Sequence, residues 1–159
     1  MDVYEYTFTR HKVAEFPGTV HGPHDTHLVF ERLFAGRESE ALAVLCLDVK
    51  NNVIGTEVVY TGNVSATLIR VGELFRTAVR LNAASIIIGH NHPSGDPTPS
   101  PDDLHMTAEA LAAGRLLDIQ VLDHIITAEN GSDWSPAYVS LRDRGVSFDR
   151  TGVRTGGKA

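Results

Sequence analysis

Apolar residues recur along this chain with two different periods, and each period predicts one kind of element. Over residues 3–13 the period is two, with Tyr4, Tyr6 and Phe8 on one face, which predicts an edge or outer strand. Residues 84–90 (ASIIIGH) are apolar on both faces, which predicts a buried strand.

A hairpin and two later strands complete the predicted sheet. Residues 41–49 (ALAVLCLDV) are apolar on both faces, and the turn signal Asn51-Asn52 connects them to a second strand at residues 53–62. Further strands are predicted at residues 119–127 and, after a turn at Asn130-Gly131, around residues 137–141.

A period of 3.6 predicts three helices. Residues 71–82 form one of them, with the apolar stripe Val71, Leu74, Phe75, Ala78 and Val79. A longer helix runs from about residue 100 to residue 117, with the stripe Leu104, Ala108, Leu111 and Ala112. The first helix in chain order is capped by Asp25 and extends to Ala35, with Leu28, Val29 and Leu33 facing inward and Gly36 ending it.

This order of elements predicts an α/β fold in which helices flank a mixed β-sheet in three layers. A chain of 159 residues suits a single domain, which we place at residues 1–148 with its core at about residues 40–145. Residues 149–159 contain almost no apolar side chains and are predicted to form a disordered tail.

Composition and charge narrow the functions that this domain can have. The formal net charge of −6 and the pI near 5.7 disfavour direct DNA binding, because duplex binding depends on Lys and Arg at the phosphates. No apolar run approaches the ~20 residues of a membrane span, and residues 1–12 lack the apolar core of a secretory signal, so we expect a cytoplasmic protein. The single cysteine, Cys46, is expected to pack as a small buried hydrophobe.

The candidate chemistry lies in GHNHPSGDPTPSPDD, directly after the predicted buried strand. His90 and His92 are separated by one residue, so both point to the same side if the strand continues through them. The intervening loop can bring Asp103 back to them, because four prolines restrict its backbone and Gly95 permits a sharp turn. Two histidines and an aspartate with an open fourth position are typical of a catalytic zinc.

A structural interpretation of the same residues needs no metal. Ser100 can be the N-cap of the following helix, with Pro101 in its first position and Asp103 reaching back in a capping box. The two interpretations can both hold, because a helix start fixes the aspartate as firmly as a metal ligand requires.

The spacing His90-x-His92, seven residues, Ser100, two residues, Asp103 matches the signature of the JAMM/MPN-type zinc metallopeptidases. The wording HNHPSGDPTPSPDD resembles the bacterial RadC-like branch of that family, and supporting similarity extends over about residues 42–145. The resemblance implies a JAB/MPN domain related to the cytidine deaminases.

The resemblance also implies residue roles. Zn²⁺ would be held by His90, His92 and Asp103, and Ser100 would hydrogen-bond the metal-bound water or the oxyanion. A glutamate before the first central strand would be the general base, and Glu40 fits that place better than Glu38 or Glu57. Glu40 could instead be one more solvated surface acid.

The function expected from the resemblance is a zinc-dependent metallohydrolase that cleaves peptide or isopeptide bonds in a peptide or protein substrate. The alternatives are a DNA-repair or DNA-processing accessory protein of the RadC-like type and a non-catalytic MPN scaffold. The letters HNH do not indicate an HNH nuclease, because that site needs its own ββα-metal setting. Exposed edge strands make a homodimer possible.

The remaining histidines carry weaker signals. His21, His24 and His27 recur at three-residue intervals, but Gly22 and Pro23 favour a polar loop over a helical second metal site. His105 is expected to be exposed, and His124 is expected to be a hydrogen-bonded core histidine or to line the cleft.

Overall fold

The computed structural model describes residues 1–5, 7–9, 11, 18–62, 69–128 and 137–148. In chain order these residues form α1 (Pro23–Phe34), β1 (Ala41–Leu47), β2 (Val53–Thr61), α2 (Val71–Leu81), β3 (Ser85–His92), α3 (Pro101–Leu117), β4 (Gln120–Ala128) and β5 (Tyr138–Ser140). The predicted turn at Asn130-Gly131 and the predicted tail at residues 149–159 lie outside the described residues.

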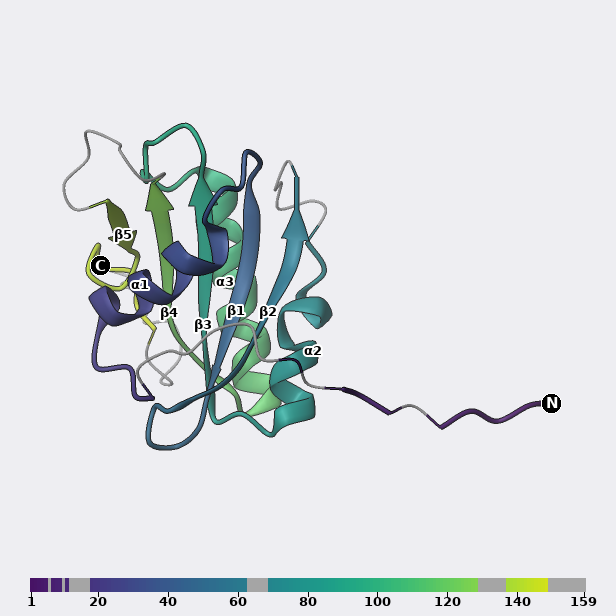
Figure 1. Ribbon diagram of the computed structural model, residues 1–159. Coiled ribbons are helices and arrows are strands. Elements are labelled where there is room, and N and C mark those ends of the chain that lie inside the picture. The colour runs from purple at the N-terminus through teal and green to yellow at the C-terminus, as the bar shows by residue number, and fades with distance from the viewer. Residues whose placement is uncertain (6, 10, 12–17, 63–68, 129–136, 149–159) are drawn as a thin grey trace.

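The strands form one mixed sheet in the order β2-β1-β3-β4-β5 (Figure 1). β1 pairs antiparallel with both β2 and β3, and β4 pairs antiparallel with β5. The pairing of β3 with β4 is parallel, with α3 as the crossover. The predicted hairpin of β1 and β2 is therefore confirmed.

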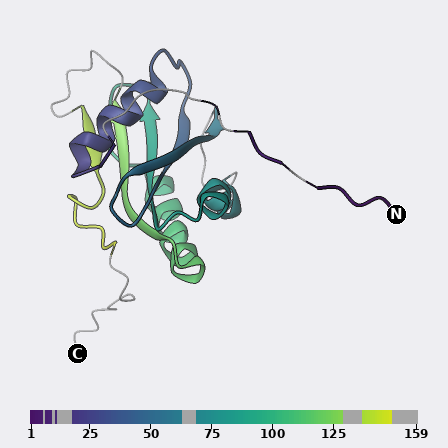
Figure 2. The ribbon, with the colours of Figure 1, turned by 60° about the horizontal axis from the view of Figure 1, so that its bottom comes forward.

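Helices cover both faces of this sheet, so the predicted three-layer α/β fold is confirmed. α1 lies on one face, whereas α2 and α3 lie on the other (Figures 1 and 2). Successive residues of β1 pack into different cores because side chains alternate across a strand: Leu42 packs on the α2 and α3 side, and Ala43 packs on the α1 side. Cys46 is buried in the first of these cores, as predicted.

The predicted strand at residues 3–13 is wrong in the described residues. Residues 1–5, 7–9 and 11 form no strand, and Val3, Tyr4 and Phe8 are exposed. Alternation alone does not make a strand, because backbone N–H and C=O groups need a neighbouring strand to pair with. The ring of Phe8 instead lies 3.7 Å below the guanidinium carbon of Arg80 on α2.

The first helix begins earlier in the chain than the predicted start at Asp25. Gly22 is its N-cap and Pro23 occupies the first turn, so the prediction that Asp25 caps the helix is wrong. Asp25 lies inside the first turn and accepts a hydrogen bond from the backbone N–H of His21. Val29 faces inward as predicted, but Leu28 is 39% exposed, because the buried face is Thr26, His27, Val29, Phe30 and Phe34.

α3 is rotated about its axis relative to its predicted stripe. Leu104 and the alanines at 108 and 112 are exposed, and the buried face is Asp103, Met106, Thr107, Ala110 and Gly114. At Gly114 a Cβ would lie 2.5 Å from the carbonyl oxygen of Ile119, so only glycine permits this close approach. On α2, Val79 is likewise exposed, whereas Leu74, Phe75 and Ala78 are buried as predicted.

Candidate metal centre

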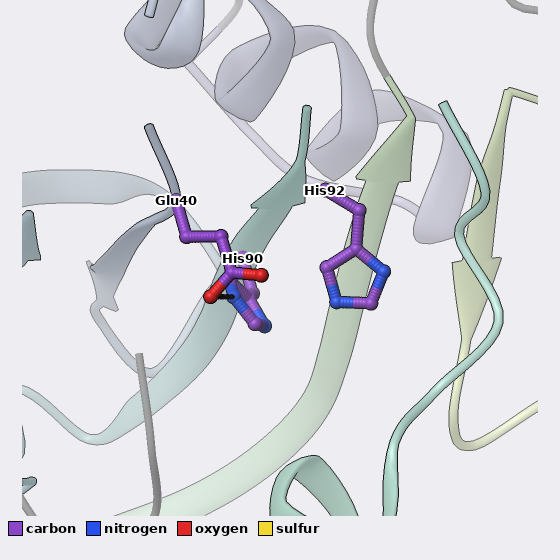
Figure 3. Close-up of side chains that lie close together, drawn as sticks. All are labelled: Glu40, His90 and His92. Atoms are coloured by element: carbon purple, nitrogen blue, oxygen red, sulfur yellow. Dashed lines mark ion pairs between the residues drawn. The ribbon is translucent and has the colours of Figure 1, made fainter. Parts of the chain in front are cut away.

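Three chain segments meet where β1 begins and β3 ends. These two strand ends lie side by side because the strands are antiparallel, with Leu42 opposite His90. Glu40 immediately precedes β1, and His90 and His92 are among the last three residues of β3 (Figure 3). α3 begins beside them and contributes Asp103. Residues far apart in the sequence therefore lie side by side.

β3 continues through His92, so His90 and His92 project from the same face of the strand. Their ring centroids are 4.7 Å apart, with the ring planes at 88°. His90 is only 1% exposed, which keeps its ring in a low-dielectric environment.

Glu40 brings a carboxylate to the two imidazoles. Glu40, His90 and His92 each offer one ligand atom, and these atoms all lie within 4.8 Å of one another. Oε2 of Glu40 lies 3.9 Å from Nε2 of His90 (Figure 3). Among the described residues this is the one group of three or more His, Cys, Asp or Glu side chains close enough to hold a metal ion. Glu38 is exposed, and Glu57 instead contacts Arg76 and Thr77.

Asp103 lies against both histidines. Its Oδ1 is 3.0 Å from Nδ1 of His90, and its Oδ2 is 3.6 Å from Nε2 of His92. The same side chain accepts hydrogen bonds from the N–H and the hydroxyl of Ser100, while Ser100 Oγ accepts from the N–H of Asp103. The predicted capping box is therefore present, and it coexists with the contact between Asp103 and the imidazoles.

The tautomer of His92 follows from its hydrogen bond to the loop. Nδ1 of His92 lies 2.8 Å from the carbonyl oxygen of Asp96, and a carbonyl can only accept. Nδ1 therefore carries the proton, and in the neutral ring Nε2 presents its lone pair toward Asp103. A backbone carbonyl that orients the second nitrogen of an imidazole is typical of metal-ligating histidines.

The donor set fits a metal cation. Neither ring nitrogen of His90 makes a hydrogen bond within the described residues, although Nδ1 is close to Asp103, so two buried polar atoms lack a partner. Burial by itself would raise the pKa of Asp103, but the close contacts with His90 and His92, the hydrogen bond from Ser100 and the charge of His90 hold the pKa of Asp103 well below its usual range. Burial opposes protonation of His92, yet its bonds to Asp103 and Asp96 raise its pKa. A buried anionic carboxylate stabilised by neighbouring positive charge is a suitable ligand for a divalent ion.

The ring of His124 is buried beside that of His90, which confirms the prediction of a hydrogen-bonded core histidine. Its ring stacks on that of His90 with centroids 6.3 Å apart, and Nδ1 is 2.8 Å from the hydroxyl of Thr107. Thr107 donates its own proton to the carbonyl oxygen of Asp103, so Nδ1 of His124 must be the donor in their bond. Burial, with a further contribution from His90, lowers the pKa of His124 to about 3.

Two residues that support the site were missed from sequence. Thr107 connects His124 to the first turn of α3, and Asn91 hydrogen-bonds the backbone on both sides of Glu40. Asn91 was visible as the middle letter of HNH, but its partners lie about fifty positions away and no local pattern identifies them.

The polar-loop prediction for the other three histidines is wrong in part. His24 and His27 lie on α1, because Pro23 begins the helix instead of interrupting it. His27 is buried and stacks on Tyr138 with ring centroids 4.5 Å apart. His105 is exposed on α3, as predicted.

The mixed β-sheet flanked by helices, with two histidines and a glutamate at strand ends and an aspartate in the first turn of α3, defines the class as a JAB-type domain. A family model described as the RadC-like JAB domain matches residues 20–146. The chain therefore belongs to the RadC-like JAB domain family, which confirms the resemblance.

Relatives with high sequence identity support this assignment. A UPF0758 protein of Roseiflexus castenholzii is 46% identical over 129 residues, which are 81% of this chain and 53% of the relative. One from Chloroflexus aurantiacus is 49% identical over 112 residues, 70% of this chain and 46% of the relative, and one from Methanosarcina barkeri is 40% identical over 133 residues, 84% and 56%. The chain spans about half the length of these relatives. None of the helices in the described ranges is long and apolar enough to cross a membrane.

Proposed function

We propose that this domain is a zinc-dependent hydrolase of peptide or isopeptide bonds, with His90, His92 and Asp103 as metal ligands and Glu40 as general base. The observation that carries the proposal is the convergence of two carboxylates on the same pair of imidazoles: Glu40 lies with His90 and His92 within 4.8 Å, and Asp103 contacts both rings. Membership of the JAB family supports it. When bound, zinc would act as a Lewis acid and would lower the pKa of a water molecule to about 7.

The proposed task of Glu40 is to move the proton. Its side chain is 32% exposed, whereas those of His90 and Asp103 are almost completely buried, so Glu40 lies on the solvent side of the cluster. A carboxylate there can take a proton from the attacking water and deliver it to the leaving amine nitrogen. On the other side of the cluster, the side chains of His90 and Asp103 are almost completely buried, which keeps these two proposed ligands out of bulk water.

Ser100 is assigned the stabilisation of negative charge on the carbonyl oxygen. Its hydroxyl proton is donated to Oδ2 of Asp103 in the structure. To serve the substrate, the hydroxyl must rotate away from Asp103, while its oxygen can keep accepting from the N–H of Asp103. Ser100 thus has a structural role at all times and a catalytic role only when the substrate is bound.

Metal quantification and peptide cleavage test the proposal together. We expect about one zinc per purified chain, and cleavage within a quenched-fluorescent peptide library or of isopeptide-linked peptides that stops with a chelator. Glu40→Gln should retain zinc and lose at least about 100-fold in kcat. Glu38→Gln, at an exposed position two residues earlier, is the matched control and should cleave normally.

Other outcomes would assign the domain differently. A zinc-loaded chain that cleaves no peptide or isopeptide probe would overturn the hydrolase and leave the scaffold alternative. Retarded migration of duplex DNA that weakens with added salt would favour the DNA-processing alternative.

A further inference from the structure

We propose that Asn91 is a positioning residue for Glu40: its side-chain amide holds the backbone on both sides of the glutamate and so fixes the distance from the base to the imidazoles. The inference rests on the proposed role of Glu40. Asn91 lies between the two histidines in the sequence, and its side chain projects from the opposite face of β3.

The contact consists of two hydrogen bonds from one side chain. The N–H of Ala41 donates to Oδ1 of Asn91 at 2.5 Å, and Nδ2 of Asn91 donates to the carbonyl oxygen of Ser39 at 3.3 Å. An N–H can only donate and a carbonyl can only accept, so these partners fix the orientation of the amide. Asn91 is 6% exposed, so water does not readily replace either bond.

Glu40 needs such a contact because the strand ladder ends before it. The pairing of β1 with β3 stops at Leu42 and His90, and Glu40 lies outside β1. Beyond the last pair, the Asn91 side chain takes the place of a ladder partner on the β3 side. On the β2 side, the N–H of Gly62 donates to the carbonyl oxygen of Glu40 at 2.8 Å. The glutamate backbone is thus held from both neighbouring strands.

Strand geometry explains how one short segment sets both parts of the site. His90 and His92 project toward the side of α3, where they meet Asp103. Asn91 projects toward the α1 side, where it lines a cavity together with Phe34 and Thr127. The residues that supply the imidazoles and the hydrogen bonds on both sides of Glu40 are consecutive in β3. One rigid strand therefore sets the 3.9 Å distance between Oε2 of Glu40 and Nε2 of His90.

Two substitutions separate the two hydrogen bonds. Asn91→Ala leaves the N–H of Ala41 and the carbonyl of Ser39 without their partner. Asn91→Asp has nearly the same shape and keeps an acceptor for Ala41, but its carboxylate cannot donate to Ser39. Neither change touches a proposed metal ligand, so both variants should bind about one zinc per chain. Ser85→Ala, which removes a buried polar side chain from the far end of β3, is the control.

The first readout is amide hydrogen exchange at Ala41, followed by NMR. In Asn91→Ala we expect exchange at Ala41 to accelerate by about tenfold or more, because one buried hydrogen bond is lost. Asn91→Asp should show a smaller acceleration, and Ser85→Ala should show none. Unchanged exchange at Ala41 in Asn91→Ala would overturn the proposal. If Asn91→Ala does not fold, Asn91→Asp and its exchange rate decide.

The second readout is a double-mutant cycle in cleavage of the peptide probe found for the wild type. Asn91→Ala should lower kcat by about 10- to 100-fold with little change in KM, because a displaced base affects the reaction more than binding. If Asn91 acts through Glu40, the double variant with Glu40→Gln should be no slower than Glu40→Gln alone. An equal further loss in the double variant would show a general structural role instead. If the wild type cleaves nothing, the proposed function fails, while hydrogen exchange still decides whether Asn91 holds this segment.

Discussion

Nδ1 of His90 lies 3.0 Å from Oδ1 of Asp103, and both side chains are almost completely buried. The two residues come from different elements, the end of β3 and the first turn of α3. A carboxylate at such a position is costly to bury without positive charge beside it, whether from an imidazolium or from a metal ion. The pair therefore links the stability of the fold to the proposed metal site.

Replacing Asp103 by Asn should remove most of the bound zinc. The substitution keeps the shape of the side chain but deletes the charge that a divalent ion requires, so we expect zinc to fall from about one per chain to a small fraction. Metal analysis after extensive dialysis measures the effect. Asp102→Asn, at the exposed neighbouring position, is the matched control. Full zinc occupancy in Asp103→Asn would remove Asp103 from the ligand set.

Replacing Ser100 by Ala should destabilise the fold by about 1 kcal/mol, the usual cost of losing a helix N-cap. The hydroxyl both accepts from the N–H of Asp103 and donates to its carboxylate, so the first turn of α3 loses two contacts at once. Urea unfolding of metal-free protein gives the free energy of unfolding. Ser100→Thr should recover most of the loss because it keeps the hydroxyl. A stability equal to that of the wild type in Ser100→Ala would show that the cap contributes nothing.

Replacing Gly89 by Ala should destabilise the packing of α1 on β3. A Cβ at residue 89 would lie 2.3 Å from the ring of Phe30, which is fully buried. Overpacking of this kind costs about 1–3 kcal/mol. Gly72→Ala on α2 is the control: no atom lies within 4 Å of the added Cβ, so the free energy of unfolding should stay equal or rise by up to about 1 kcal/mol. Phe30→Leu should relieve part of the penalty in Gly89→Ala.

His27 should make the fold less stable in mild acid. Burial lowers the pKa of His27 in the folded state, the nearby charge of Glu31 partly opposes this, and His24 adds to it. Below the ordinary value of 6.5 the unfolded chain therefore binds a proton that the folded chain does not, so stability falls as the pH falls through that range.

Urea unfolding at pH 7.5 and 5.5 measures this dependence. His27→Phe retains an aromatic ring against Tyr138 and removes the titrating group, so its loss of stability between the two pH values should be smaller than that of the wild type. His105→Gln serves as the control for removal of an exposed imidazole. An acid loss in His27→Phe as large as in the wild type would mean that His27 does not titrate in this range.

The order and type of most elements follow from the sequence. The segments of β1 and β3 are largely apolar on both faces, and the stripe of α2 contains Leu74 and Phe75, so period and composition alone identify them. The capping box of Ser100 and Asp103 is equally local, since its two residues are three positions apart. The HxH spacing also predicts two rings on one face, because strand geometry requires it.

Tertiary structure decided everything that depends on pairing between distant segments. Residues 3–9 alternate like a strand, but no strand pairs with the described ones, and the Asp103 face of α3 is buried although Leu104 is more apolar. Glu40 comes within 3.9 Å of His90, and Asn91 reaches Ser39 and Ala41, only because β1 and β3 are antiparallel neighbours. Side-chain period is a property of one segment, whereas register and helix rotation are set by the packing of several. The sequence alone therefore determined which groups are available, and the packing of the sheet decided which of them meet.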